Sequence, residues 1–297
     1  MGIKRFVMLF SWCCSAPIFG QDALQRQIRT IAAEAQGKVS VACSLPGTAV
    51  NCDLNPRNHP PMQSVFKLPL AVTAFHMVES GHFSLDQPVR FLATDRILPT
   101  TYSPLQDKYP QAEVDIPLRE LLQAAVTLSD NAATEIILRI VGGPALVDKY
   151  IRKIGVKGFH LQDNEATLHR DVTAQYRNWF EPAAAVQLLL RLNRNSPLNT
   201  EHNSLLLGWM RDSPSGPNRI KGQLPPGTII MHKTGTSGVK NGLAHATNDI
   251  GLVALPSGSK LAIAIFVTDS TADQVTRESV IARIASAAYQ AAVKTGK

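Results

Sequence analysis

The stretch 62-MQSVFKLPLAV-72 places a serine and a lysine three residues apart at the start of an apolar helix. Positions i and i+3 share one helical face, so Ser64 and Lys67 are expected to lie close together. The residues that follow, up to Val78, are apolar nearly all round, which is typical of a buried helix. Pro69 has no backbone N–H, so we expect an irregular first turn. Burial at the end of such a helix makes the charged ammonium form of Lys67 costly. A lysine whose neutral form is favoured in this way is suited to accept a proton from Ser64.

The segments on either side of this helix predict an α/β (α+β) fold. Helical spacing marks residues 22–36, 62 to about 210 and 277–294, and strand-like runs occupy 39–45, 48–54, 227–235, 248–255 and 260–269. The simplest architecture is an antiparallel sheet of about five strands, built from both ends of the chain and flanked by the terminal helices. We expect residues 21–61 and 212–297 to form this α/β subdomain and residues 62–211 to form an inserted all-helical subdomain, together making one domain.

The N-terminus has the layout of a secretory signal peptide. Lys4 and Arg5 precede an apolar run from Phe6 to about Cys14, and small residues follow before Gln21. Cleavage near Gly20 is expected, so that residues 1–20 are removed. No later stretch reaches about 18 apolar residues without a charge or a breaker. The sequence therefore predicts an exported protein with no membrane anchor in its mature form.

Export leaves two cysteines in the mature chain, Cys43 and Cys52. If Gly47 and Thr48 form a two-residue hairpin turn, the two cysteines face each other across paired strands. A disulfide is then open to them in an oxidising compartment. Two buried thiols acting as small hydrophobic groups are the alternative, and the sequence does not decide between them.

Composition excludes several classes of partner. The formal net charge is +7, yet there is no dense basic run interleaved with aromatic residues and no nucleic-acid recognition motif, so no nucleic-acid partner is expected. The eight histidines show no spacing typical of zinc ligands, so no metal is expected either.

Two further motifs accompany the serine and lysine of the first one. Ser129–Asn131 spell SDN after an amphipathic helix, and Lys233–Gly238 spell KTGTSG at the end of an apolar strand. Gly235 would leave room for a ligand close to the backbone. Two of the three motifs have chance twins, since SxxK recurs at Ser257–Lys260 and KTG at Lys294–Gly296. Each motif alone is a weak signal, but all three occur in the expected order, each on the expected kind of element, and this combination is specific.

With these three motifs the chain resembles the class A serine β-lactamases over nearly all of its mature length. SVFK, SDN and KTGT match the family in type, order and approximate separation, and NEATLH falls where the family carries its Ω-loop glutamate. The resemblance implies that Ser64 is the nucleophile, Lys67 its partner and Ser129 the relay that protonates the leaving nitrogen. Glu165 would activate the water that frees the acyl-enzyme.

The same resemblance implies a set of substrate contacts. Asn131 would bind the side-chain amide of the substrate, and its carboxylate would lie against Lys233, Thr234, Gly235 and Thr236. The backbone N–H groups of Ser64 and Thr236 would form the oxyanion hole. Tyr102 would line the entrance, and Arg219 would support the carboxylate pocket from behind. For these last two, a surface aromatic and a solvated charge are the alternatives.

Some positions depart from the commonest family pattern. His169 stands where most members have asparagine, and Asp163 and Asn178 stand where many members have an Arg–Asp pair that braces the Ω-loop. The sequence therefore does not determine which residue is the second ligand of the deacylating water, or which residues brace the Ω-loop. Similar substitutions, with HKTGTSG and QYRNW, resemble the PER-like branch, whose members often accept bulky cephalosporins.

The resemblance implies hydrolysis of penicillins and cephalosporins by a periplasmic, monomeric enzyme that needs no cofactor. A penicillin-binding DD-peptidase and a non-hydrolysing β-lactam sensor are the alternatives, because both use the same acylation machinery. Both lack a dedicated deacylating carboxylate, so Glu165 argues against them.

Overall fold

The computed structural model describes residues 18–295, apart from the side chains of 18–22 and of His169. Its centre is a five-stranded antiparallel sheet in the order β1-β9-β8-β6, with β7 also paired to β8. The strands are β1 (Lys38–Ser44), β6 (Ile230–Thr236), β7 (Val239–Lys240), β8 (Leu243–Ala254) and β9 (Lys260–Ser270). The first strand comes from the N-terminal part of the chain and the others from the C-terminal part, which confirms the predicted α/β (α+β) architecture.

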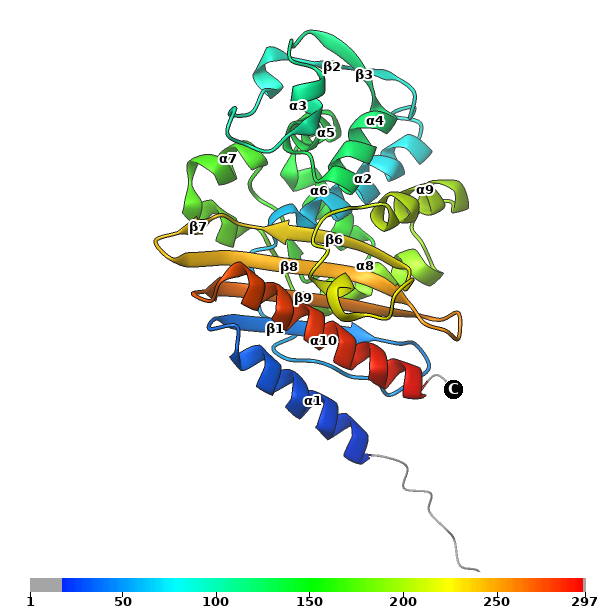
Figure 1. The fold of residues 1–297 in the computed structure, drawn as a ribbon. Coiled ribbons are helices and arrows are strands. Elements are labelled where there is room, and N and C mark those ends of the chain that lie inside the picture. The colour runs from blue at the N-terminus through cyan, green and yellow to red at the C-terminus, as the bar shows by residue number, and fades with distance from the viewer. Residues whose placement is uncertain (1–17, 296–297) are drawn as a thin grey trace, which may run out of the picture.

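Each face of the sheet carries its own hydrophobic core. Along β9 the side chains alternate: Ile263 and Ile265 belong to one core cluster, whereas Ala264 and Phe266 belong to the other. The helices α1 (Ile18–Ala33) and α10 (Gln274–Thr295) cover the first face (Figure 1). The opposite face packs against α8 (Pro182–Arg194) and the helical region beyond it. Among the described residues, no helix is both long enough and apolar enough to cross a membrane.

The inserted region is mostly helical and lies on one side of the sheet (Figure 1). Its other helices are α2 (Lys67–Glu79), α3 (Pro104–Lys108), α4 (Leu118–Gln123), α5 (Asn131–Val141), α6 (Pro144–Lys153), α7 (Glu165–Arg170) and α9 (Thr200–Arg211). The region also contains two small antiparallel ribbons, β2 (Pro88–Phe91) with β3 (Val114–Pro117) and β4 (Phe159–His160) with β5 (Trp179–Phe180). The expectation of an all-helical insert missed both, because strands of two to four residues are too short to show a period.

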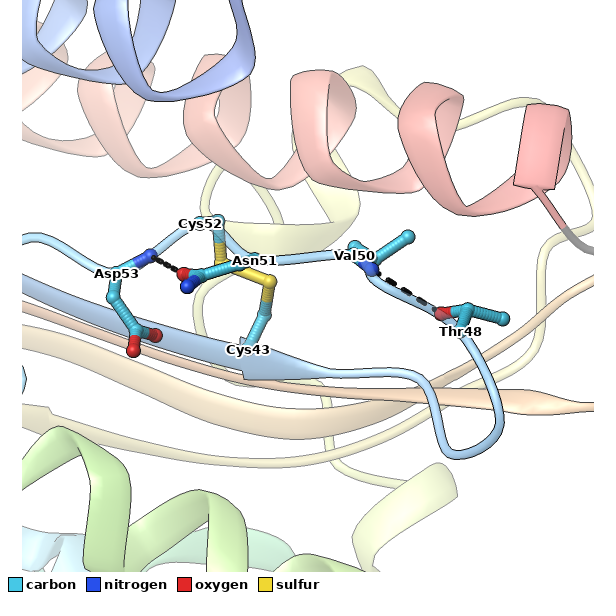
Figure 2. The surroundings of a disulfide bond; sticks show 6 residues. All are labelled: Cys43, Thr48, Val50, Asn51, Cys52 and Asp53. Atoms are coloured by element: carbon cyan, nitrogen blue, oxygen red, sulfur yellow. Dashed lines mark hydrogen bonds between the residues drawn. A yellow bond between two sulfur atoms is a disulfide. The ribbon is translucent and has the colours of Figure 1, made fainter. Parts of the chain in front are cut away.

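Cys43 and Cys52 form a disulfide, with their Cα atoms 5.6 Å apart. The expected hairpin is wrong, however: β1 pairs with β9, and the segment that carries Cys52 forms no strand beside β1 but a single isolated bridge, Val41–Leu54. Figure 2 shows a local reason, since Thr48 Oγ1 accepts from Val50 N and Asn51 Oδ1 accepts from Asp53 N at 2.8 Å. Such short side-chain turns compete with the hydrogen bonds of a strand.

The predicted signal segment 1–20 lies almost wholly outside the described residues and stays a prediction. The first described helix begins at Ile18 and ends at Ala33 rather than spanning 22–36. Gln36 has a φ of 46°, in the left-handed region, and this turns the chain from α1 into β1.

Candidate active site

Ser64 lies on a 3₁₀ turn, Gln63–Phe66, that leads directly into α2. The irregular first turn predicted from Pro69 is therefore confirmed. Val65 and Phe66 are completely buried and anchor the turn, whereas Ser64 is only partly buried. The serine is thus held at the mouth of a buried helix and is itself not fully buried.

Lys67 is fully buried and is surrounded by oxygen atoms from two other segments. Its Nζ donates to the backbone oxygen of Ser129 at 2.8 Å and to Oδ1 of Asn131, and it lies 3.1 Å from Oε1 of Glu165. A buried ammonium group requires such partners, because removing it from water costs several kcal/mol (order of magnitude). Lys67 therefore ties together the SDN loop, the segment of Glu165 and the turn of Ser64.

The SDN loop has an unusual backbone that aims Ser129 toward this lysine. A π-helical turn, Ala124–Leu128, ends at Ser129, which has φ 60° and ψ 32° in the left-handed region. Asp130, to which sequence analysis gave no role, caps α5 by accepting from Ala133 N at 2.9 Å and also accepts from Ser103 Oγ at 2.8 Å. An aspartate just before an apolar helix is an N-cap pattern that could have been recognised.

Lys233, on β6, also contacts this loop. Its Nζ donates to Ser129 Oγ at 2.9 Å and to the backbone oxygen of Thr234 at 3.1 Å. Complete burial, followed by the charge of Lys67, lowers the pKa of Lys233 well below its ordinary value. Two lysines therefore converge on Ser129, one at its carbonyl and one at its hydroxyl.

Gly235 is required by the packing of β6 against the turn of Ser64. A Cβ at this position would lie 2.4 Å from the backbone oxygen of Met62, closer than any real contact. Asn248 strengthens the same junction by donating from Nδ2 to the backbone oxygen of Pro61 at 2.9 Å. The group that lies close to Gly235 is thus the backbone of Met62, not the ligand that the sequence had suggested. This contact places β6 directly beside the turn of Ser64.

Arg219 is 4% exposed, which excludes the alternative of a solvated surface charge. Its guanidinium donates to Thr236 Oγ1 at 2.8 Å and to the backbone oxygen of Asn248 at 2.9 Å, and it pairs with Glu278 at 3.2 Å. It therefore contacts the exposed Thr236 from a buried position. That it supports a carboxylate pocket stays a prediction.

Tyr102 is 59% exposed and lies just before α3. Partial burial and the nearby carboxylates of Asp130 and Asp107 raise its pKa. The position of Tyr102 at the entrance of the site stays a prediction.

Glu165 is the first residue of α7 and is 4% exposed. Its neighbours are fixed by Glu135 of α5, which accepts from Asn164 Nδ2 at 2.9 Å and from Ala166 N at 3.2 Å. Burial raises the pKa of Glu135, and the charge of Glu165 acts in the same direction. Sequence analysis missed Glu135 because it lies one helical turn after SDN and belongs to no motif.

The segment around Glu165 is braced by Asn178 and by an Arg–Asp pair in which Arg177, the residue before Asn178, supplies the arginine. Asn178 Oδ1 accepts from the backbone N–H groups of Gln162 and Asp163 at 2.9 Å each, and its Nδ2 donates to the carbonyl of Asp163 at 2.8 Å. Arg177 pairs with Asp163 at 2.7 Å and with Asp171 at 3.2 Å. His169 lies in α7, and its side chain is outside the described part of the structure.

A hollow of about 230 Å³ opens between the Glu165 segment and the strand edge. It is lined by Gln63, Glu165, Leu168, Val172, Gln175, the run 236–240 and His245. Of the residues predicted to act in catalysis, Glu165 lines this hollow, Lys67 contacts Glu165 and Ser129, and Ser64 lies on the turn that leads into the helix of Lys67. In the part of the chain that the structure describes, no group of three His, Cys, Asp or Glu residues is placed to hold a metal ion.

Comparisons with known proteins agree with this arrangement. A model of the Beta-lactamase enzyme family matches residues 23–292. The extended-spectrum β-lactamase PER-1 of Pseudomonas aeruginosa is 39% identical over 91% of this chain and 88% of its own length. The β-lactamase VEB-1 of the same species is 34% identical over 89% of this chain and 88% of its own.

Solved structures are similar over the whole fold. A β-lactamase from Chitinophaga pinensis superposes with a TM-score of 0.88 at 40% identity, covering 91% of this chain and 99% of its own. The motifs, the converging side chains and these matches lead to one conclusion: the chain belongs to the class A β-lactamase family.

Proposed function

We propose that the protein opens the ring of penicillins and cephalosporins through an acyl-enzyme on Ser64. The observation that carries this proposal is the contact of buried Lys67 with both Ser129 and Glu165, directly beside the turn of Ser64. In acylation, Ser64 Oγ attacks the lactam carbonyl and loses its proton to Lys67 or Glu165. The C–N bond then breaks, and Ser129 Oγ delivers a proton to the leaving nitrogen.

Binding would use the strand edge and the SDN loop. Lys233, with Thr234 and Thr236, would hold the substrate carboxylate, and Arg219 behind Thr236 would add positive charge. The N–H groups of Ser64 and Thr236 would stabilise the oxyanion, a contact often worth about 3 kcal/mol per donor. Asn131 would bind the side-chain amide, Gly235 would keep the strand against the serine turn, and Tyr102 would line the entrance.

Deacylation would use Glu165 as the base. A water bound beside the acyl-serine would lose a proton to Glu165 and attack the ester carbon, and Ser64 would regain its proton as the C–O bond breaks. Burial of Glu165 beside Lys67 supports a dedicated deacylating group. This favours hydrolysis over a DD-peptidase or a sensor that stays acylated.

The substrate range is proposed to include bulky cephalosporins. PER-1 is named an extended-spectrum enzyme, and the hollow between the Glu165 segment and residues 236–240 offers space for a large side chain. Steady-state hydrolysis of a chromogenic cephalosporin by the purified protein tests the function, and a bulky cephalosporin in the same assay tests the range. Stoichiometric acylation without turnover would instead identify a sensor.

Lys233→Ala should weaken both substrate capture and turnover, because the substrate carboxylate loses its counter-charge and Ser129 loses its donor. We expect kcat/KM to fall by at least about a hundredfold, as for removal of a charged contact made in the transition state. Lys294→Ala is the control: Lys294 begins the second KTG, is exposed and lies in the last turn of α10. Equal losses at the two positions would contradict the assignment of Lys233.

Three further features remain proposals. We place the mature protein in the periplasm as a monomer, after removal of residues 1–20. We divide its single catalytic domain into an α/β part, 21–61 and 212–297, and a mainly helical part, 62–211. No cofactor, nucleic acid or membrane anchor is part of this proposal.

A further inference from the structure

Three side chains from three elements meet where the Glu165 segment passes the edge of the sheet. Tyr176 lies in the 3₁₀ turn Val172–Arg177, His245 in β8 and Asp269 in β9. The hydroxyl of Tyr176 donates to Oδ1 of Asp269 and lies 2.7 Å from Nδ1 of His245. His245 Nδ1 is also 3.4 Å from Oδ1 of Asp269. We call Tyr176, His245 and Asp269 the Tyr176 latch.

The protons of the latch can be assigned from its contacts. Tyr176 has one hydroxyl proton, and its contact with Asp269 uses it, so Nδ1 of His245 must carry a hydrogen if it is to bond to the phenol oxygen. Lys38 Nζ approaches the other oxygen of Asp269 at 3.3 Å. Asp269 therefore accepts from three sides, and every member of the latch has a complementary partner.

The ionisation states of the latch agree with this assignment. Burial raises the pKa of Asp269, but hydrogen bonds from Tyr176, Lys38 and His245 outweigh it, and the net shift is downward. Burial and the bond to Asp269 raise the pKa of Tyr176. An ionised acceptor thus faces a neutral donor at neutral pH, which makes a strong, charge-assisted hydrogen bond.

The backbone at Asp269 has an uncommon conformation that its surroundings must stabilise. Its φ is 52°, in the left-handed region that non-glycine residues rarely adopt. In the register of β8 and β9, His245 stands opposite Asp269, between the pairs Ala244–Ser270 and Ala246–Thr268. Such a conformation persists only where the surroundings over-determine it. Here the backbone turns the carboxylate toward the passing Tyr176.

The latch lies on the segment that brings Glu165 to the site. His245 and Glu165 line the same hollow, and Gln175, next to Tyr176, accepts at 2.7 Å from Gln63, which precedes Ser64. The side chain of Asn178 bonds within the segment, at 162–163, and its backbone oxygen accepts from Met62 N at 3.1 Å. Tyr176 joins the same segment to both β8 and β9.

We propose that the Tyr176 latch is a positioning device for deacylation. It holds the Glu165 segment against the sheet, so that the carboxylate of Glu165 stays close to the acyl group on Ser64. This inference rests on the proposed function. Lys67, which is held by Ser129 and Asn131, does not depend on the latch. Loss of the latch should therefore slow deacylation much more than acylation.

Tyr176→Phe removes only the hydroxyl. We expect kcat and KM for a penicillin to fall together, by about tenfold, while kcat/KM falls by less than about threefold, because slow deacylation lowers both constants. Intact-mass spectrometry at steady state should show more acyl-enzyme than in the parent protein. Tyr109→Phe is the matched control, since Tyr109 makes a similar hydroxyl–carboxylate bond to Glu120 at 3.0 Å in the helical region.

Asp269→Asn gives an independent test, because asparagine tolerates the left-handed backbone better than most residues. It should reproduce the parallel fall in kcat and KM, and the double variant with Tyr176→Phe should be little worse than the more affected single variant. A fall in kcat/KM equal to that in kcat, at unchanged KM, would overturn the latch, and so would a Tyr176→Phe protein indistinguishable from Tyr109→Phe. Failure of the parent protein to hydrolyse any penicillin or cephalosporin would instead overturn the proposed function.

Discussion

Ser64→Ala is expected to abolish β-lactam turnover, lowering kcat/KM by at least about a thousandfold, because the attacking oxygen is removed. The change removes one hydroxyl from a partly buried position at a helix mouth, so no core cavity forms. The free energy of unfolding should change by less than about 1 kcal/mol. Hydrolysis kinetics and thermal unfolding of the two purified proteins measure both effects.

Ser257→Ala is the control for Ser64→Ala. Ser257 begins the second SxxK, but it is exposed in the turn between β8 and β9, and its partner Lys260 bonds to Asn193 at 3.1 Å. Its activity should equal that of the parent. If Ser64→Ala retained near-parental hydrolysis, the assignment of the nucleophile would be wrong.

The sequence predicted those parts of the site whose chemistry lies within a short motif. Ser64 and Lys67 are three residues apart on one turn, so their proximity is local. The order of the three motifs then indicated the family. The hydrophobic periodicity of the strands and helices predicted the sheet and its terminal helices. These features need no knowledge of how distant segments meet.

Contacts between distant segments could not be predicted in this way. The glycine at 235 reads as room for a ligand until the structure places the carbonyl of Met62 against it. Glu135 belongs to no motif, and Arg177 lies in QYRNW without an assigned role, yet both hold the Glu165 segment through bonds to residues 14 to 31 positions away. The Tyr176–Asp269 contact spans 93 positions. Such pairs depend on the packing of whole elements, which a local pattern does not contain.

The failed hairpin at the cysteines has a local cause. An apolar alternation at 48–54 favours a strand. Side chains of Thr48 and Asn51 instead bond to the backbone two residues on, and the free edge of β1 receives the isolated Val41–Leu54 bridge. Local side-chain bonds thus outweighed the strand propensity.

Glu165→Gln is expected to separate the two halves of the reaction. Glutamine keeps the size and the place at the start of α7 but loses the negative charge that takes a proton. Lys67 loses its ion-pair partner at 3.1 Å, yet it keeps the carbonyl of Ser129 and the amide oxygen of Asn131. The variant should therefore still react with a penicillin at Ser64 and then stall, with deacylation slowed by at least about a thousandfold.

Intact-mass spectrometry should show this stall as a stoichiometric adduct, whereas the parent protein with the same drug should show little. Glu201→Gln, at an exposed position of α9, removes the same charge far from any motif and should behave as the parent. His169 lies four residues after Glu165 on α7, and a neutral imidazole there would orient or partly activate the water. If it does so, deacylation slows without stopping, and adding His169→Ala should deepen the stall. Turnover of Glu165→Gln at the parental rate would show that Glu165 is not the deacylating base, because a buried carboxylate that activates the water cannot lose its charge without loss of the second step.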